Sequence, residues 1–199
     1  MIKEHRPQPS HLSLDSFRRE VLRQTVHVVL GLVCMMMLYS TSILFFREFV
    51  IVLLLVGAIV SLFAEKKWVP FLNKWLIHVE REGEHVPGEA AFLFMLGVGL
   101  TSFIFSSILP VLVGIVAYTF QDSFSTVFGL RYGKTKILGS KSLEGSLAGL
   151  VGCWIPLSII ITPGPALVVA IVATLVELFP INDALGVPLA SALVFAGMG

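Results

Sequence analysis

The stretch Pro110–Gly145 reads PVLVGIVAYTFQDSFSTVFGLRYGKTKILGSKSLEG, in which a long apolar run passes directly into a cluster of polar residues. A helix needs about 20 mostly apolar residues to cross the hydrocarbon core of a membrane, and the run up to Phe128 is nearly that long. Asp122 lies near its end, and glycines, four basic residues and Glu144 follow. An explanation of the function must say why so apolar a chain gathers these polar groups in one place.

The composition as a whole indicates a membrane protein. Of the 199 residues, 56% are hydrophobic and 14% are charged, whereas soluble domains carry about 25% charged residues. The net charge is +1, and no basic stripe with interleaved aromatic residues occurs, so nothing indicates nucleic-acid binding. Cys34 and Cys153 lie in apolar runs and fit no metal-ligand spacing, which predicts two inert buried thiols.

The apolar runs are continuous rather than alternating, which favours helices over the strands of a barrel. Residues 1–20 form a polar segment that is too long for the head of a signal peptide, so residues 21–199 are expected to form one transmembrane domain. We expect an all-α bundle of six to seven membrane-spanning helices. The seven candidate spans are residues 24–44, 47–64, 88–108, 110–128, 145–162, 165–180 and 184–199.

The basic residues predict the orientation of these spans, because short cytoplasmic connections are enriched in Lys and Arg. Of the 14 basic residues, all except Arg47 fall in the N-terminal segment or in alternate connections between spans. This pattern predicts a cytoplasmic N-terminus, and it places the segment after Phe128 on the cytoplasmic side as well.

The connection between the second and third spans has a helical pattern of its own. Trp68, Phe71, Trp75 and Val79 recur at helical spacing, with Lys74 on the opposite side. This predicts an amphipathic helix lying in the cytoplasmic membrane interface. Two interpretations remain open, a helix that only connects two spans and a gate through which lipids pass.

Ionisable residues near the spans gather on the predicted cytoplasmic side. Such groups are costly in a membrane and are therefore functional candidates. The candidates are Arg23, His27, Arg81, Glu84, Glu89, Asp122, Lys141, Glu144, Glu177 and Asp183. Structural alternatives remain for several of them: Arg23 as a membrane anchor, His27 as a buried core histidine, and Asp122 as a structural partner of Lys141 or Arg131. One-sided clustering indicates a site that serves a lipid and a water-soluble partner.

The polar segment after Asp122 contains the components of a triphosphate site. Glycines such as Gly129 and Gly133 allow backbone N–H groups to approach an anion closely. Lysines add point charges for phosphate, and a helix N-terminus favours negative charge. The candidate phosphate-binding residues are Gly129, Gly133, Lys134, Lys136, Lys141, Ser142 and Gly145. Asp122, Glu144 and Asp183 are candidate ligands of Mg²⁺, although no Walker A or Rossmann motif occurs.

Four motifs along the chain resemble those of the CTP-dependent polyprenol kinases, which include dolichol kinases, phytol kinases and CTP-dependent diacylglycerol kinases. Asp122–Gly133 with KSLEG at 141–145 resembles the family's CTP-binding motif, and RQTVH at 23–27 is similar to its early Arg-x-x-x-His signature. REGEHVPGEAAFLFMLG is similar to a second, acidic segment, and NDALGVPL, which begins at Asn182, resembles a late Asn-Asp motif. Three departures are Ser125 where Ala is frequent, a single Lys141 in place of two lysines, and Ala184 in place of Asn.

The resemblance implies a membrane kinase that moves the γ-phosphoryl group of CTP to a polyprenol, a related isoprenoid alcohol or a diacylglycerol, with Mg²⁺ as cofactor. Ser125 would then belong to the nucleotide site, Lys141 would clamp phosphate, and Asp122, Glu144 and Asp183 would hold Mg²⁺ or activate the alcohol. Arg23 and His27 would contact the nucleotide or the lipid hydroxyl. Two rival interpretations are a cytidylyltransferase that forms a CDP-lipid, and a small transporter or non-catalytic membrane protein.

Overall fold

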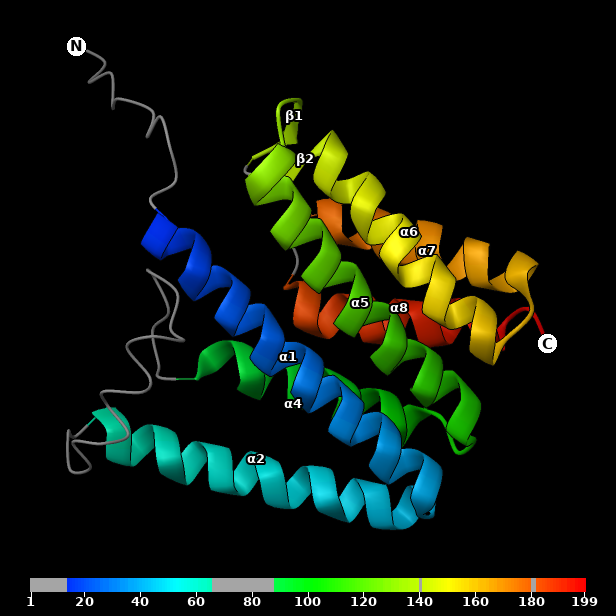
Figure 1. Ribbon diagram of the computed structural model, residues 1–199. Coiled ribbons are helices and arrows are strands. Elements are labelled where there is room, and N and C mark those ends of the chain that lie inside the picture. Colours follow the sequence, from blue (N-terminus) through cyan, green and yellow to red (C-terminus); the bar gives the residue numbers. More distant parts are fainter. Residues whose placement is uncertain (1–13, 66–87, 140, 180–181) are drawn as a thin grey trace, which may run out of the picture.

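The computed structural model describes residues 14–65, 88–139, 141–179 and 182–199. Within these ranges the chain forms seven helices and one short two-stranded hairpin (Figure 1). The helices are α1 (Leu14–Ser40), α2 (Ile43–Glu65), α4 (Glu89–Ile104), α5 (Ile108–Tyr132), α6 (Leu143–Ile160), α7 (Pro163–Leu178) and α8 (Asp183–Ala196). The hairpin pairs β1 (Lys136–Leu138) with β2 (Lys141–Ser142) in antiparallel fashion.

Four helices are long and apolar enough to cross a membrane, which confirms the class of helical membrane protein. The qualifying segments are Phe17–Ser40, Ile43–Phe63, Ile108–Tyr132 and Leu143–Ile160. Helices α4, α7 and α8 are also apolar but shorter, at 16, 16 and 14 residues. Helices α4 and α7 fall just short of the lower limit of about 17 residues for a membrane-spanning helix, and α8 falls clearly short of it.

Each of the seven predicted spans coincides with one of these helices, with differences at the ends. Helix α1 begins at Leu14 rather than near residue 24, because the polar residues before the apolar run are good helix formers and continue its first turns. Helix α5 continues to Tyr132 rather than ending at 128. The hairpin was not expected, and the predicted amphipathic helix at 68–79 lies outside the described residues.

Helix α5 lies at the centre of the bundle and packs against α1, α4, α6, α7 and α8 (Figure 1). Glycines allow two of the closest helix contacts. A Cβ atom at Gly97 of α4 would collide with the backbone carbonyl of Ala184 in α8, and one at Gly114 of α5 would lie 2.5 Å from the carbonyl oxygen of Pro188. These contacts fix α8 against α4 and α5, and so they fix the position of Asp183 at its first residue.

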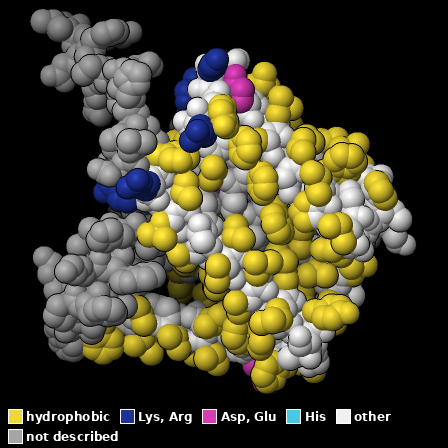
Figure 2. Space-filling model, viewed as in Figure 1, with side chains coloured by type: hydrophobic (Ala, Val, Ile, Leu, Met, Phe, Trp, Pro, Cys, Tyr) yellow, Lys and Arg dark blue, Asp and Glu magenta, His cyan; other side chains and the backbone are white. Residues whose placement is uncertain are grey.

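The helices alternate in direction, so the start of α1, the end of α5, and the starts of α6 and α8 lie at one end of the bundle with the hairpin (Figure 1). We call this the hairpin end. Figure 2 shows hydrophobic side chains over most of the visible face, whereas Lys and Arg side chains gather near the hairpin and the start of α1. The apolar belt and the charged end match the surface expected of a protein embedded in lipid.

Arg47 is the basic residue that falls outside the predicted cytoplasmic connections. It lies at the end of the bundle opposite the hairpin end and has a structural role. Its Nε donates to the carbonyl oxygen of Ser102 at 2.8 Å, and its Nη2 donates to that of Phe105 at 3.3 Å. The guanidinium also lies 5.3 Å from the centroid of the Phe103 ring. Arg47 therefore binds carbonyl groups at the end of α4 that lack partners within the helix.

Candidate active site

Three carboxylates from three helices meet at the hairpin end. Asp122 lies on α5, Glu177 in the last turn of α7 and Asp183 at the first residue of α8, and one oxygen atom from each lies within 4.8 Å of the others. At Mg–O distances of about 2.1 Å, adjacent octahedral ligands lie about 3 Å apart and opposite ones about 4.2 Å, so the three carboxylates would have to move closer together to bind one ion. We call these three residues, together with Lys141, the acid cluster.

Glu177 is the most buried member of the acid cluster, with 2% of its surface exposed. Its Oε1 accepts hydrogen bonds from Ser125 Oγ and from Lys141 Nζ, each at 2.6 Å. Its Oε2 accepts from Nε2 of Gln121. A buried carboxylate is stable only when it is paired and hydrogen-bonded, and these three donors satisfy that requirement.

Lys141 links two of the acids, because its Nζ lies 2.6 Å from Glu177 Oε1 and 2.9 Å from Asp183 Oδ2. Burial by itself would lower the pKa of Lys141. The charges and hydrogen bonds of Glu177 and Asp183 outweigh that effect, so the pKa lies above its ordinary value. Lys141 thus pairs with two of the three carboxylates, Glu177 and Asp183, and the cluster has three acidic groups for one ammonium group.

The hairpin brings Lys141 to the acid cluster, and Glu144 holds the hairpin in place. The Glu144 carboxylate accepts from the backbone N–H groups of Lys134 and Thr135, at 3.0 and 3.2 Å, and from Thr135 Oγ1 at 3.0 Å. The turn between the strands includes Gly139 at φ 56°, a conformation that favours glycine. Glu144 was expected to be a metal ligand, but its oxygens bind the hairpin backbone, and Glu177 takes its place among the grouped carboxylates.

The space beside the glycines that are expected to approach phosphate is filled by other atoms of the protein. A Cβ atom at Gly145 would lie 2.7 Å from the carbonyl oxygen of Ser125, and one at Gly133 would lie 2.5 Å from Ser142 Oγ. Ser142 is buried, and its hydroxyl caps α6 by accepting from the N–H group of Gly145 at 3.2 Å. We call Gly129, Gly133 and Gly145, grouped around Ser142, the glycine contact, because it lets α5 and α6 approach closely.

Arg23 and His27 are buried on α1, on the side of the bundle that faces Asp122. Arg23 is 8% exposed and pairs with Glu20, and His27 is 6% exposed. The His27 ring lies 6.5 Å from the ring of Tyr118, which is one turn before Asp122 on α5. The two α1 residues therefore lie on the part of α1 that packs against the Asp122 region of α5.

The remaining candidates lie apart from these groups or outside the described residues. Asn182 caps α8, because its side chain accepts from the N–H group of Ala184 at 3.1 Å. Lys134 and Lys136 are exposed on the hairpin, and Glu89 lies in the first turn of α4. Arg81 and Glu84 fall outside the described residues.

Sequence reasoning missed Gln121, which is fully buried and donates to Glu177. The signal was present, because an amide within an apolar span is costly unless it has a partner. Gln24 was also missed. It is 3% exposed on α1, and its Oε1 accepts from Ser123 Oγ on α5 at 3.2 Å.

Comparison with known proteins identifies one archaeal relative. Over 135 residues the chain is 31% identical to Uncharacterized protein MJ1137 of Methanocaldococcus jannaschii. The match covers 65% of this chain and 66% of that protein, just under two thirds of its length. No family profile and no solved structure matches the chain. The relative's name assigns no activity, so the function has to be inferred from the site itself.

Proposed function

We propose that the protein is a CTP-dependent lipid kinase, which transfers the γ-phosphoryl group of CTP to the hydroxyl of an isoprenoid alcohol or a diacylglycerol. The observation that carries this proposal is the meeting of Asp122, Glu177 and Asp183 with Lys141 at the hairpin end. Phosphoryl transfer needs positioned cations around phosphate more than it needs covalent chemistry from the protein. The resemblance of four sequence motifs to the CTP-dependent polyprenol kinases supports the choice of nucleotide.

Asp122, Glu177 and Asp183 would hold Mg²⁺, which neutralises charge on the transferring phosphoryl group when it is bound. The donor set fits, since carboxylate oxygens are the protein ligands that Mg²⁺ prefers and the cluster has an excess of negative charge. Lys141 Nζ reaches two of the three acids and would turn from Asp183 to a phosphate oxygen when the nucleotide binds. Arg23, buried on α1, would turn from its partner Glu20 to supply a second positive charge.

In the transfer step the alcohol oxygen bonds to the γ-phosphorus, the bond from that phosphorus to the CDP oxygen breaks, and the hydroxyl proton must leave. We assign His27 as the acceptor for this proton, because it is buried on α1 and its ring lies 6.5 Å from that of Tyr118, one turn before Asp122. A positioned base of this kind contributes about 10²–10⁴-fold to a rate. Replacement of His27 by Gln should therefore lower kcat by about that factor and leave CTP binding intact; unchanged kcat would rule out this role.

We also propose that the hairpin end faces the cytoplasm and that all seven helices span the membrane. The basic residues support this orientation, because Arg18, Arg19, Arg131 and Lys134 lie at the hairpin end and Arg47 lies at the other. CTP is then available to the acid cluster from the cytoplasm. Modification of introduced cysteines near Lys134 and near Arg47 by an impermeant reagent, in intact and opened cells, would test it; labelling near Lys134 in intact cells would contradict it.

The activity can be tested directly on protein purified in detergent. Labelled CTP or ATP is mixed with Mg²⁺ and a panel of prenols and diacylglycerol, and the products are separated. A kinase forms CDP and a lipid phosphate. A cytidylyltransferase acting on phosphatidate, for which the same acids would serve, releases pyrophosphate and forms a CDP-lipid. Absence of both products across the panel would indicate that the acid cluster is a structural network of ion pairs.

A further inference from the structure

A groove of about 290 Å³ runs along the contact between α1 and α5. Its walls are apolar and include Val21 and Val28 from α1 and Phe124 from α5. Its polar lining consists of Gln24 and Thr25 from α1 and of Ser123 from α5. The groove thus combines a surface suited to a hydrocarbon chain with a small polar patch.

The polar patch has an unused hydrogen-bond donor. Gln24 is 3% exposed, and its Oε1 accepts from Ser123 Oγ. Its Nε2 is buried and has no hydrogen-bond partner among the described residues. A buried donor without a partner costs about 1–3 kcal/mol, so an acceptor brought by a ligand in the groove would remove that cost.

The patch also lies beside the proposed chemistry. Ser123 directly follows Asp122 on α5, and His27 lies about one turn beyond Gln24 on α1. The His27 ring lies 6.5 Å from that of Tyr118, one turn before Asp122 on α5, and its Nδ1 is likewise buried without a partner among the described residues. A hydroxyl group held at Gln24 and Ser123 would therefore lie near the groups proposed to activate it.

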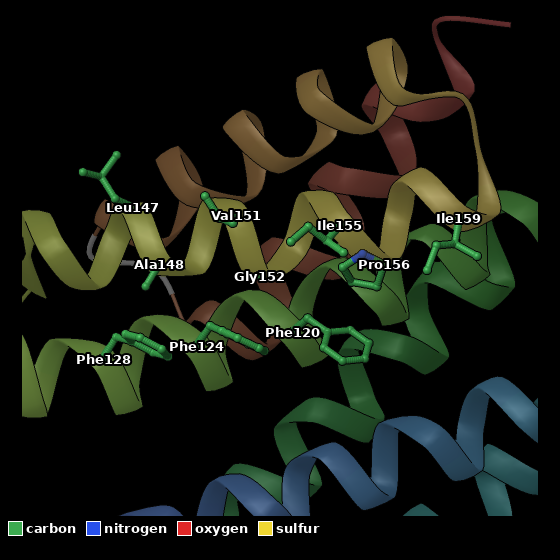
Figure 3. Close-up of a pocket in the computed structure, with 10 residues that line it drawn as sticks. All are labelled: Phe120, Phe124, Phe128, Leu147, Ala148, Val151, Gly152, Ile155, Pro156 and Ile159. Carbon is green, nitrogen blue, oxygen red and sulfur yellow. The ribbon is translucent and has the colours of Figure 1, made fainter.

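Two other apolar grooves are less suited to an alcohol. The groove between α5 and α6 measures about 590 Å³, and its walls are apolar side chains such as Phe120, Val151 and Ile155, which offer nothing to a hydroxyl (Figure 3). The groove between α2 and α4 includes Ser61 and Glu89, which already have interactions of their own. Phe124 lines both the α1–α5 and the α5–α6 grooves and therefore stands between them.

We infer that the α1–α5 groove binds the acceptor lipid, with its hydroxyl at Gln24 and Ser123 and its chain along Val28 and Phe124. Among the described residues that line this groove none is charged. A neutral alcohol can enter such a site, whereas the phosphate of phosphatidate would lose its hydration without gaining a cation. The inference rests on the proposed function for the identity of the acceptor, and it favours the kinase over the cytidylyltransferase.

Photolabelling tests the location without any turnover. A long-chain prenol with a diazirine in its chain is irradiated with the wild-type protein in detergent, and the labelled peptides are identified. Labels on Val21–Val29 and Ser123–Phe128, displaced by unlabelled prenol but not by phosphatidate, are the expected result. Labels confined to Leu147–Ile159, or equal displacement by phosphatidate, would overturn the inference.

Substitutions then separate the groove from the phosphoryl-transfer chemistry. Gln24→Leu should raise the KM for the prenol about tenfold, the value of one hydrogen bond, and leave the KM for CTP unchanged. Val28→Trp should block the groove, whereas the matched control Val151→Trp, which fills the α5–α6 groove, should keep wild-type prenol kinetics. The reverse pattern for the two Trp variants would overturn the inference. Specific labelling of a protein without kinase activity would instead contradict the proposed function alone.

Discussion

The acid cluster and the glycine contact both involve α5, through Asp122 and through Gly129 about two turns later, but are built in opposite ways. In the acid cluster, side chains from four separate elements approach with unequal charge, and three carboxylates face one ammonium. In the glycine contact, side chains are nearly absent, and the backbones of α5 and α6 meet around one capping hydroxyl. The cluster has more acidic than basic groups, as the proposed binding of a cation requires, whereas the glycine contact leaves little room for a ligand and holds α5 and α6 close together.

The largest effect that would separate these roles is expected at Lys141. Lys141→Met leaves Glu177 buried without its cation, and it should cost about 2–3 kcal/mol of stability, below the value of about 3–5 kcal/mol for fully buried pairs because Lys141 is partly exposed. It should also lower kinase turnover by more than about 100-fold.

The double variant Lys141→Met with Glu177→Gln serves as the control for folding. The neutral amide removes the unpaired charge, so thermal unfolding in detergent should return to within about 1 kcal/mol of the wild type. Turnover should stay low. Recovery of activity together with stability would mean that neither Lys141 nor Glu177 takes part in catalysis and that the two form only a structural ion pair.

The glycine contact should respond in stability and not in chemistry. In Gly145→Ala, the new methyl group would meet the Ser125 carbonyl oxygen at 2.7 Å and Gly129 Cα at 2.9 Å, so about 1–3 kcal/mol should be lost. In the matched variant Gly129→Ala, the nearest atom is Ser142 Oγ at 3.3 Å, and the helix gains up to about 1 kcal/mol of propensity. The two melting temperatures should therefore shift in opposite directions. Equal shifts would show that backbone crowding does not determine the stability of the glycine contact.

A substitution of Glu144 tests whether the hydrogen bonds that hold the hairpin have a role separate from that of the acid cluster. Glu144→Gln keeps an acceptor oxygen for the hairpin backbone but removes the charge, so the KM for Mg²⁺ should not change and turnover should fall at most about fivefold. Asp183→Asn, which alters a grouped carboxylate, is the comparison. A larger rise in the Mg²⁺ requirement for Glu144→Gln than for Asp183→Asn would restore Glu144 as a metal ligand.

A smaller effect is expected at alkaline pH. Because Glu177 and Asp183 raise the pKa of Lys141 above 10.5, its ion pairs contribute full stability below pH 10.5 and lose it as the pH rises past the raised value. The wild type should therefore lose stability more steeply above this pH than the double variant, which lacks the ammonium group. Parallel curves of melting temperature against pH would contradict this.

Hydropathy was sufficient to predict the helices, because each apolar run must satisfy its backbone within lipid. It could not predict the hairpin, since strands of three and two residues leave no periodic signal. The acids at 122, 177 and 183 and the lysine at 141 are candidates on the basis of their cost in a membrane. The sequence does not predict that Glu177 rather than Glu144 groups with Asp122 and Asp183, because two carboxylates at helix ends differ only in which backbone or side chain each one meets.

The proposed kinase function depends most on the binding of Mg²⁺ and CTP together at the acid cluster. The decisive measurement is equilibrium binding of labelled CTP to the purified protein, with and without Mg²⁺, for the wild type, Asp122→Asn and Asp183→Asn. We expect Mg²⁺-dependent binding that weakens at least about tenfold in both variants, as the loss of one charged interaction predicts. Equal binding of CTP by all three proteins, or binding that is indifferent to Mg²⁺, would contradict the account.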